Sequence, residues 1–310
     1  MRWIRPVSRS TPRRAFIPPQ SVIVTDIQLD WLRRFGHRGL SIDDTFNTSK
    51  WPYKLTTVML LDEKDRGVPA AFLLSSHTTQ EEIFTLFKCI TDLLPTFDTN
   101  WVMSDDAPAF INGFRRDIPR SRAVPLHCQW HVMKNLRQYV TDVYGGKDER
   151  GKEVGATARS IAKTVQRDEF WKKAISFLSD LEDTGHDKQY KKYFEKYLHE
   201  FALWAPFARV HAPFNTTMVS ESFRSKLKMS ILGDNTLSRV DRLVDVLINL
   251  PADLSEELKI ADKKKYVSGV FRLQSQMAAH KGGVSYGETQ PTVTRSDTKT
   301  WKMESVKKGG

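Results

Sequence analysis

Residues 39–128 alternate short apolar runs with turn-like links, and this pattern limits the possible folds more than any other feature of the chain. The runs GLSIDDTF, KLTTVMLLD and GVPAAFLLS are separated by links short enough for antiparallel hairpins. Next come an amphipathic helix over residues 79–94, a strand TNWVMSD, a helix around residues 107–114 and a strand RAVPLHC. This order predicts an α/β fold with a mixed five-stranded sheet and helices on both faces.

From residue 130 to about residue 207 the spacing of apolar residues becomes helical, which predicts an all-α insertion. One helix there is expected to bury the face formed by Trp171, Ile175 and Leu178. Another is expected to bury the stripe Tyr190, Phe194, Tyr197, Leu198 and Phe201.

The remaining segments differ from these two regions in composition. A short helix is expected near residues 26–35, one more around Glu221, and another over residues 237–250 with Asn235 or Thr236 as its cap. Beyond Ala279 apolar residues are few, which predicts disorder. The chain is thus expected to comprise a basic N-terminal arm (1–36), the first part of the sheet domain (37–128), the helical insertion (129–212), helices that complete the core (213–250), and a C-terminal helical segment with a disordered tail (251–310).

The balance of charge favours a polyanionic partner. The chain has 48 Lys and Arg against 37 Asp and Glu, a net charge of +11, and such residues provide most non-specific affinity for nucleic acid. Cys89 and Cys128 are too few for a disulfide framework or a four-cysteine zinc knuckle, and they fit a reducing compartment. No run of eighteen apolar residues and no signal peptide occurs, so we expect a chain that is neither secreted nor membrane-spanning.

Three acidic residues are candidates for a metal site. Asp43 in LSIDDTF and Asp105 in WVMSDD lie where apolar strand-like runs end, and Glu221 lies in a helical segment, MVSESFRSKLK. Taken singly, each has an ordinary structural explanation, since Asp is common in turns and Glu complements a helix dipole in the first turn. Together they could form a carboxylate cluster that holds Mg²⁺ or Mn²⁺ and hydrolyses phosphodiesters.

Five segments in order resemble those of the Mutator-like (MULE) transposases: IDDTF followed by KWPYKLTTV, VMSDDAPAF, LHCQWHVMKN, and ESFRSKL. The resemblance covers roughly residues 37–230. It implies an RNase H-like catalytic domain with an acidic DDE triad and a helical insertion before the glutamate. Its triad falls on Asp43, Asp105 and Glu221, which would hold two Mg²⁺ or Mn²⁺ ions without any nucleotide cofactor.

The register of the two aspartates has neighbouring alternatives, because Asp44 follows Asp43 and Asp106 follows Asp105. Alternation along a strand places Asp43 and Asp44 on opposite faces, so only one of them can point into the site. The motif match selects Asp43 and Asp105.

Cys128 and His131 match the family's C-x-x-H element, and their spacing resembles half of a zinc site. With no second cysteine pair, we expect a structural role near the active site rather than zinc, or contact of His131 with the scissile phosphate. Arg224 and Lys228 follow Glu221 at i+3 and i+7 and share its helix face. They are expected either to hold DNA phosphates or to screen Glu221 and face solvent.

The resemblance implies a nuclear enzyme that nicks DNA at the terminal inverted repeats of an element and joins the 3′ end to target DNA, as a homodimer or larger synaptic complex. Two alternatives remain: a domesticated relative that binds DNA as a transcriptional regulator without cutting it, and an RNase H-like nuclease acting on RNA–DNA hybrids. No P-loop motif occurs. Two cysteines are too few for the family's N-terminal zinc domain and C-terminal SWIM-type motif, so we expect a fragment or a degenerate copy.

Overall fold

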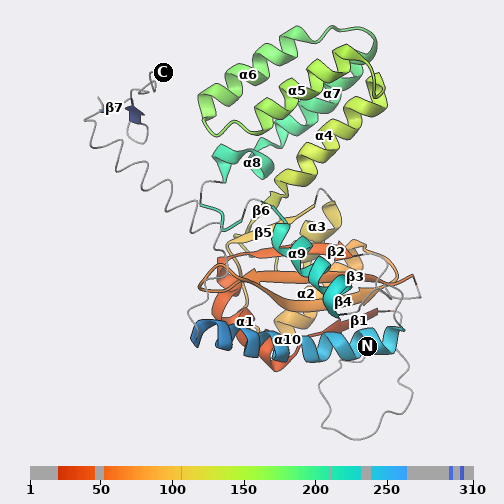
Figure 1. Ribbon diagram of the computed structural model, residues 1–310, viewed down its shortest axis with the longest axis vertical. Coiled ribbons are helices and arrows are strands. Elements are labelled where there is room, and N and C mark those ends of the chain that lie inside the picture. Colours follow the sequence, from red (N-terminus) through yellow and green to blue (C-terminus); the bar gives the residue numbers. More distant parts are fainter. Residues whose placement is uncertain are drawn as a thin grey trace, which may run out of the picture. The chain divides into compact units, whose positions relative to one another are not determined.

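The computed structural model describes residues 20–45, 52–105, 107–209, 211–214, 216–231, 239–263, 293–295 and 301–303 (Figure 1). Within them, a mixed sheet of six strands has the order β1-β4-β3-β2-β5-β6. Neighbours β2, β3 and β4 are antiparallel, as the hairpin links predicted, whereas β5 runs parallel to β2 and β6 parallel to β5. The strands are β1 (Gln20–Ile23), β2 (Leu40–Thr45), β3 (Lys54–Leu61), β4 (Gly67–Ser75), β5 (Trp101–Ser104) and β6 (Val124–His127).

The sixth strand is β1, and the prediction of five strands was wrong on this point. β1 pairs antiparallel with β4 at the edge of the sheet, with Ile23 opposite Phe72. Its sequence signal is only four residues long and directly follows Pro18 and Pro19. Such a short run has too few residues to show the alternation that marks a strand, so pairing with β4 rather than local pattern defines it.

Helices cover the sheet, whose strands β2, β3 and β4 are almost entirely buried. α9 and α10 pack against one face, where Leu243, Leu247 and Leu250 of α10 meet Phe72 and Leu74 of β4. α1, α2 and α3 pack against strands of the same sheet. The helices are α1 (Asp26–Phe35), α2 (Gln80–Leu93), α3 (Pro108–Asp117), α9 (Met218–Ser225) with the π-helical turn η3 (Lys226–Ile231), and α10 (Val240–Lys263).

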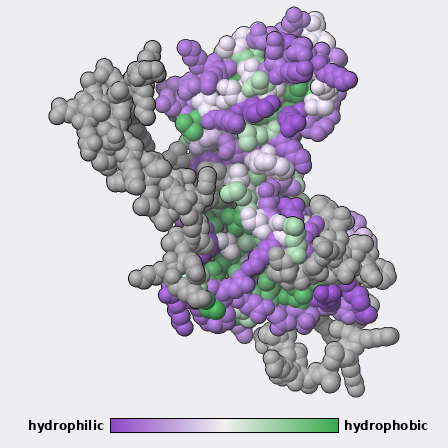
Figure 2. Space-filling model, in the orientation of Figure 1, coloured by the Kyte–Doolittle hydropathy of each residue, from purple (hydrophilic) through white to green (hydrophobic). Residues whose placement is uncertain are grey.

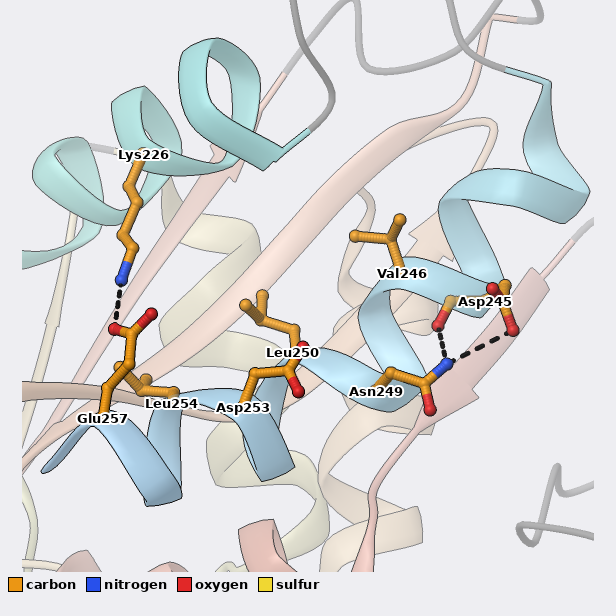
Figure 3. A pocket seen from close by; sticks show the side chains of 8 residues that line it. All are labelled: Lys226, Asp245, Val246, Asn249, Leu250, Asp253, Leu254 and Glu257. Carbon is orange, nitrogen blue, oxygen red and sulfur yellow. Dashed lines mark hydrogen bonds and ion pairs between the residues drawn. The ribbon is translucent and has the colours of Figure 1, made fainter. Parts of the chain in front are cut away.

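α10 is longer than the helix predicted over residues 237–250, because it continues through Pro251. A short groove between η3 and α10 is bridged by Lys226, whose Nζ lies 2.7 Å from an oxygen of Glu257 (Figure 3). Both side chains are exposed, so this ion pair contributes little to stability. The predicted caps Asn235 and Thr236 lie outside the described residues.

Helices α4 to α8, between β6 and α9, surround an aromatic core of their own. Tyr190, Phe194 and Tyr197 are buried there, as the apolar stripe predicted, and Trp204 is fully buried. Ile175 was predicted to be buried and is not, with 63 % exposed, because α6 turns Phe170, Ala174 and Phe177 inward instead. The helices are α4 (Gln129–Tyr144), α5 (Glu149–Ala162), α6 (Arg167–Asp180), α7 (Gly185–His199) and α8 (Phe201–Trp204).

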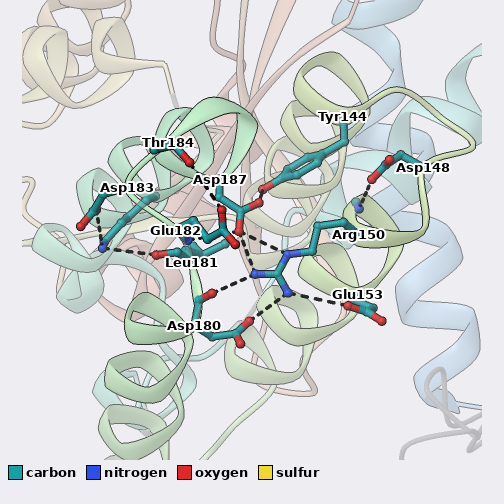
Figure 4. Close-up of polar contacts among 12 residues, drawn as sticks. Tyr144, Asp148, Arg150, Glu153, Asp180, Leu181, Glu182, Asp183, Thr184 and Asp187 are labelled. Atoms are coloured by element: carbon teal, nitrogen blue, oxygen red, sulfur yellow. Dashed lines mark hydrogen bonds and ion pairs between the residues drawn. The ribbon is translucent and has the colours of Figure 1, made fainter.

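A polar network centred on Asp187 joins three of these helices (Figure 4). The Asp187 carboxylate accepts hydrogen bonds from the Tyr144 hydroxyl at 2.7 Å and from Arg150 Nη2 at 2.8 Å. Burial raises the pKa of Asp187, but the bonds from Arg150 and Tyr144 outweigh it and hold the pKa below its usual value. The network fixes α4, α5 and α7 to one another through charge-assisted bonds.

A second compact unit comprises residues 258–310. In it, β7 (Val293–Arg295) pairs antiparallel with β8 (Trp301–Met303). Both strands lie in the segment for which the sequence predicted disorder, and the rest of that predicted tail lies outside the described residues, as does the basic arm up to residue 19. Among the described helices, none combines the length and the apolar character that a membrane span requires.

Candidate functional site

The adjacent carboxylates Asp43 and Asp44 point to opposite faces of β2. Asp43 lies beside Thr57 in the sheet register and contacts α9, the helix packed on one face. Asp44 accepts hydrogen bonds from Thr56 and Thr78, and Thr78 directly precedes the N-terminal cap of α2. The pleat of the strand therefore separates the two acids, and Asp43 shares a face with the helix that carries Glu221.

Asp43 is a buried carboxylate held by a guanidinium. Arg224 Nη2 donates a hydrogen bond to Asp43 Oδ2 at 2.7 Å, and the Asp44 backbone N–H donates to Oδ1 at 3.0 Å. Burial raises the pKa of Asp43 to about 6, the positive charges of Arg224 and His131 oppose this rise, and the charge of Asp105 adds to it. Asp43, Asp105 and His131 thus interact electrostatically although they come from β2, the end of β5 and α4.

Three contacts about one helical turn apart attach α9 to the sheet domain. Thr217, just before the first turn of α9, donates hydrogen bonds to the Cys128 sulfur. One turn on, the Ser220 hydroxyl lies 3.0 Å from that of Ser41 on β2, and Arg224 follows with its bond to Asp43. Because residues three to four apart share a helix face, these contacts form one row on α9, and Glu221 lies directly beside that row.

Cys128 lies at the end of β6 and is fully buried. Its Sγ accepts hydrogen bonds of 3.3 Å from both the backbone N–H and the hydroxyl of Thr217. Burial raises the pKa of the Cys128 thiol, but hydrogen bonds from His131 and Thr217 outweigh it, and the pKa lies below its usual value. His131 shows the reciprocal shift, since the bond to Cys128 raises its pKa, burial lowers it, and the charges of Cys128, Asp43 and Asp105 raise it further.

Arg209 is a buried cation close to Cys128. Its Nη2 donates to the backbone carbonyl of His127 at 2.7 Å and to that of Leu203. Burial lowers the pKa of Arg209 to about 10, and the negative charge of Cys128 opposes this change. Arg209 thus joins the end of β6 to α8 next to the thiol.

Asp105 and Glu221 are both half-buried. Asp105 Oδ1 accepts a hydrogen bond of 3.0 Å from the Ala107 backbone N–H at the start of α3. Glu221 lies on α9 one turn before Arg224. In the described part of the chain, no three His, Cys, Asp or Glu side chains are grouped closely enough to hold a metal ion. Asp106, the alternative to Asp105, lies outside that part.

The two basic residues predicted on the Glu221 face have different surroundings. Arg224 was expected to hold phosphate, to screen Glu221 or to face solvent, whereas in the structure it is bonded to Asp43. Lys228 is half-buried on η3, and burial followed by repulsion from Arg224 lowers its pKa. Sequence reasoning missed Thr217, Ser41 and Arg209. Of these, only Thr217 had a recognisable signal, its position just before a helix.

The donor set of Asp43, Asp105 and Glu221 fits a hard divalent cation in its chemistry, because all three offer carboxylate oxygens. In the structure, the group next to the Asp43 carboxylate is the Arg224 guanidinium and not a further metal ligand. A cation there would therefore compete with Arg224 for the Asp43 carboxylate.

These features define a mixed α/β domain in which buried and half-buried carboxylates lie beside guanidinium and imidazole groups, a combination able to bind metal ions and phosphates. In a comparison with known families, residues 39–135 match the model of the MULE transposase domain. The matched segment runs from β2 into α4 and includes Asp43, Asp105, Cys128 and His131, but not Glu221. No curated protein matches the chain significantly. The match supports a transposase-related function and, with it, DNA binding in general.

Proposed function

We propose that this chain is a DNA transposase catalytic domain of RNase H-like type, which cleaves DNA strands and transfers them to a target by a DDE triad. The observation that carries the proposal is that the segment matching the MULE transposase domain contains both Asp43 and Asp105, whose charges interact. Glu221 completes the triad, and the row of contacts through Thr217, Ser220 and Arg224 supports its presentation beside the Asp43 face. The order of three antiparallel strands followed by two parallel ones is consistent with the proposed fold type.

In this proposal Asp43, Asp105 and Glu221 would hold two Mg²⁺ or Mn²⁺ ions. When bound, such ions activate water or a 3′-hydroxyl and stabilise the leaving oxygen. Arg224, once released from Asp43, would be free to donate paired hydrogen bonds to a phosphate, as guanidinium groups do. His131, whose pKa is raised beside Cys128, would offer a further donor to the scissile phosphate.

The wider setting follows from the same proposal. The DNA partners would be the terminal inverted repeats of an element and its target, the compartment would be the nucleus, and the working form would be a homodimer or larger synaptic complex. The net charge of +11 is consistent with a polyanionic partner.

A second candidate, a domesticated DNA-binding regulator without catalysis, is favoured by two observations. Asp43 is already neutralised by Arg224, and no group of three metal donors occurs in the described residues. A binding protein could keep that ion pair permanently as part of its core.

The test is nicking of supercoiled plasmid DNA by the full chain in Mg²⁺ or Mn²⁺. Asp105→Asn and Glu221→Gln are expected to abolish nicking, whereas the matched control Asp44→Asn, on the opposite face of β2, should retain it. Circular dichroism of each variant checks that it folds. DNA binding without nicking in the parent chain would reject the transposase and favour the regulator. Equal loss in all three variants would reject the assignment of the triad.

A further inference from the structure

Helix α7 carries a row of exposed lysines on the helical insertion. Lys188, Lys192 and Lys196 follow one another at intervals of four residues and are all exposed. Within the described residues, no carboxylate oxygen lies within 4.0 Å of any of their three ammonium groups, although other lysines of the insertion, such as Lys191, are paired. Like charges at this spacing repel one another, so the row slightly destabilises the helix that carries it.

The acids of α7 and of the preceding turn form no ion pair with this row, although the pKa of Asp183 is lowered by the hydrogen bond from Lys191 and, less strongly, by the charge of Lys188. Asp187 points inward and is held by Arg150 and Tyr144 (Figure 4). Asp183 pairs with Lys191 at 2.8 Å. Glu195, which is half-buried, is the remaining acid within α7 and forms no ion pair with the three lysines. Hydrophilic residues also dominate the helical region on the molecular face drawn in Figure 2.

Two tyrosines lie beside the lysines. Tyr139 of α4 stacks on Tyr193 of α7, with ring centroids 3.7 Å apart and planes inclined by 15°. Both are half-buried, and together with the three lysines and Gln189 they line a shallow hollow of about 450 Å³. The stack holds α4 and α7 together and gives the lysine row a rigid base.

We propose that this surface, formed by Lys188, Lys192, Lys196, Tyr139 and Tyr193 and here called the lysine face, binds the phosphate backbone of duplex DNA. Eight residues of helix span about 12 Å, and duplex DNA carries one phosphate charge per about 1.7 Å of its axis, so several phosphates face that length. Lysine ammonium groups and tyrosine hydroxyls contact phosphates without reading bases. The proposal rests on the proposed function for the identity of the partner, DNA. It assigns binding of the DNA backbone to a surface separate from the acidic residues.

The experiment measures binding of the full chain to a short fluorescent DNA duplex by anisotropy over a range of salt concentrations. The test variant is Lys188→Gln/Lys192→Gln/Lys196→Gln, which keeps most of each side chain and removes three charges. The matched control is Lys147→Gln/Lys163→Gln/Lys172→Gln, which removes three exposed charges from the same insertion. Urea unfolding of both variants checks that the helices remain folded.

We expect the test variant to bind DNA more weakly and to show a salt slope smaller by about 2.7, since each phosphate contact contributes about 0.9. Between about 50 and 200 mM salt, the parent should therefore lose about 40-fold more affinity for DNA than the variant. The control variant should keep the parent's slope. Parent-like binding by the test variant overturns the proposal, and so does an equal loss in both variants, which would indicate an effect of net charge alone.

Failure of this proposal can be told apart from failure of the proposed function. If the parent nicks plasmid DNA and the test variant binds DNA like the parent, only the lysine face is rejected. If the parent does not nick and the test variant still loses affinity, the lysine face stands and the chain is a DNA-binding protein. If the test variant binds DNA like the parent but no longer associates with itself, the surface would be reassigned to contact with a second copy of the chain.

Discussion

Cys128 and Thr217, which are 89 positions apart in the sequence, are joined by two hydrogen bonds of 3.3 Å to one sulfur atom. The bonds connect the end of β6 to the start of the helix that carries Glu221 and Arg224. His131 interacts with the same sulfur, so the C-x-x-H element links the insertion, the sheet and α9 at one point. This contact gives Cys128 a positioning role that needs no metal.

Replacing Cys128 should therefore reveal its role as a hydrogen-bond acceptor. Cys128→Ala leaves the buried Thr217 donors unsatisfied and is expected to lower the free energy of unfolding by about 1–3 kcal/mol, whereas Cys128→Ser keeps an acceptor and should cost less. At Cys89, whose pKa burial raises to about 12, the order should reverse, because burying a hydroxyl costs more than burying a methyl group. Urea denaturation of the four variants measures this, and the same order at both sites would contradict it.

The raised pKa of Asp43 predicts how stability depends on pH. Between pH 3.8 and about 6 the folded chain binds a proton at Asp43 that the unfolded chain has lost, so stability falls as pH rises through this window. Asp43→Asn removes the dependence. Between pH 4 and pH 7 the stability of the variant relative to the parent should therefore rise by about 2–3 kcal/mol, from 1.36 kcal/mol per pKa unit. Urea titrations of both proteins at several pH values measure the difference, and parallel curves would refute the assignment.

Metal binding can be followed without any activity assay. If Asp43 and Asp105 are ligands, Mn²⁺ at about 100 times its Kd should stabilise the folded parent by about 2.7 kcal/mol and raise its Tm. Asp43→Asn and Asp105→Asn should lose this shift, and Asp44→Asn should keep it. Arg224→Gln is expected to bind Mn²⁺ more tightly, because no guanidinium then competes for Asp43. Weaker binding by Arg224→Gln would show that Arg224 supports the site instead of competing for it.

Two helical glycines should respond in opposite directions to substitution by alanine. At Gly113 in α3 an added Cβ would lie 2.6 Å from Ile83 Cβ and 2.9 Å from the Phe84 backbone nitrogen of α2. Gly113→Ala is therefore expected to destabilise the fold by about 1–3 kcal/mol through overpacking. At Gly155 in α5 the nearest atom, from Val140, is 3.6 Å away. Gly155→Ala should stabilise the protein by up to about 1 kcal/mol, the difference in helix propensity. Thermal unfolding distinguishes the two, and destabilisation by both would show that the α4–α5 packing is tighter than it appears from these distances.

Local sequence determined most of the secondary structure. The strand pattern of residues 39–128, the helix ended by Pro95 and the helix around Glu221 were predicted from alternation, helical spacing and turn residues, each of which acts over a few neighbouring positions. The opposite orientation of Asp43 and Asp44 was also predicted, because the period of a strand is fixed at two residues. Where such local signals were short or ambiguous, as for β1 and the exposed Ile175, the prediction was wrong.

Tertiary structure alone decided which groups meet. Nothing near Asp43 in the sequence indicates that Arg224, 181 positions later, would become its ion-pair partner, or that Thr217 would bond to Cys128. These pairings arise because burial of apolar side chains such as Phe223 against Phe72 sets the position and rotation of α9, and the polar groups then pair with whatever lies opposite. The sequence by itself determined the strands, the helices and the candidate acids. Only the packing of α9 on the sheet decided that Asp43 lies against a guanidinium, because hydrophobic burial carries no residue-specific pairing information along the chain.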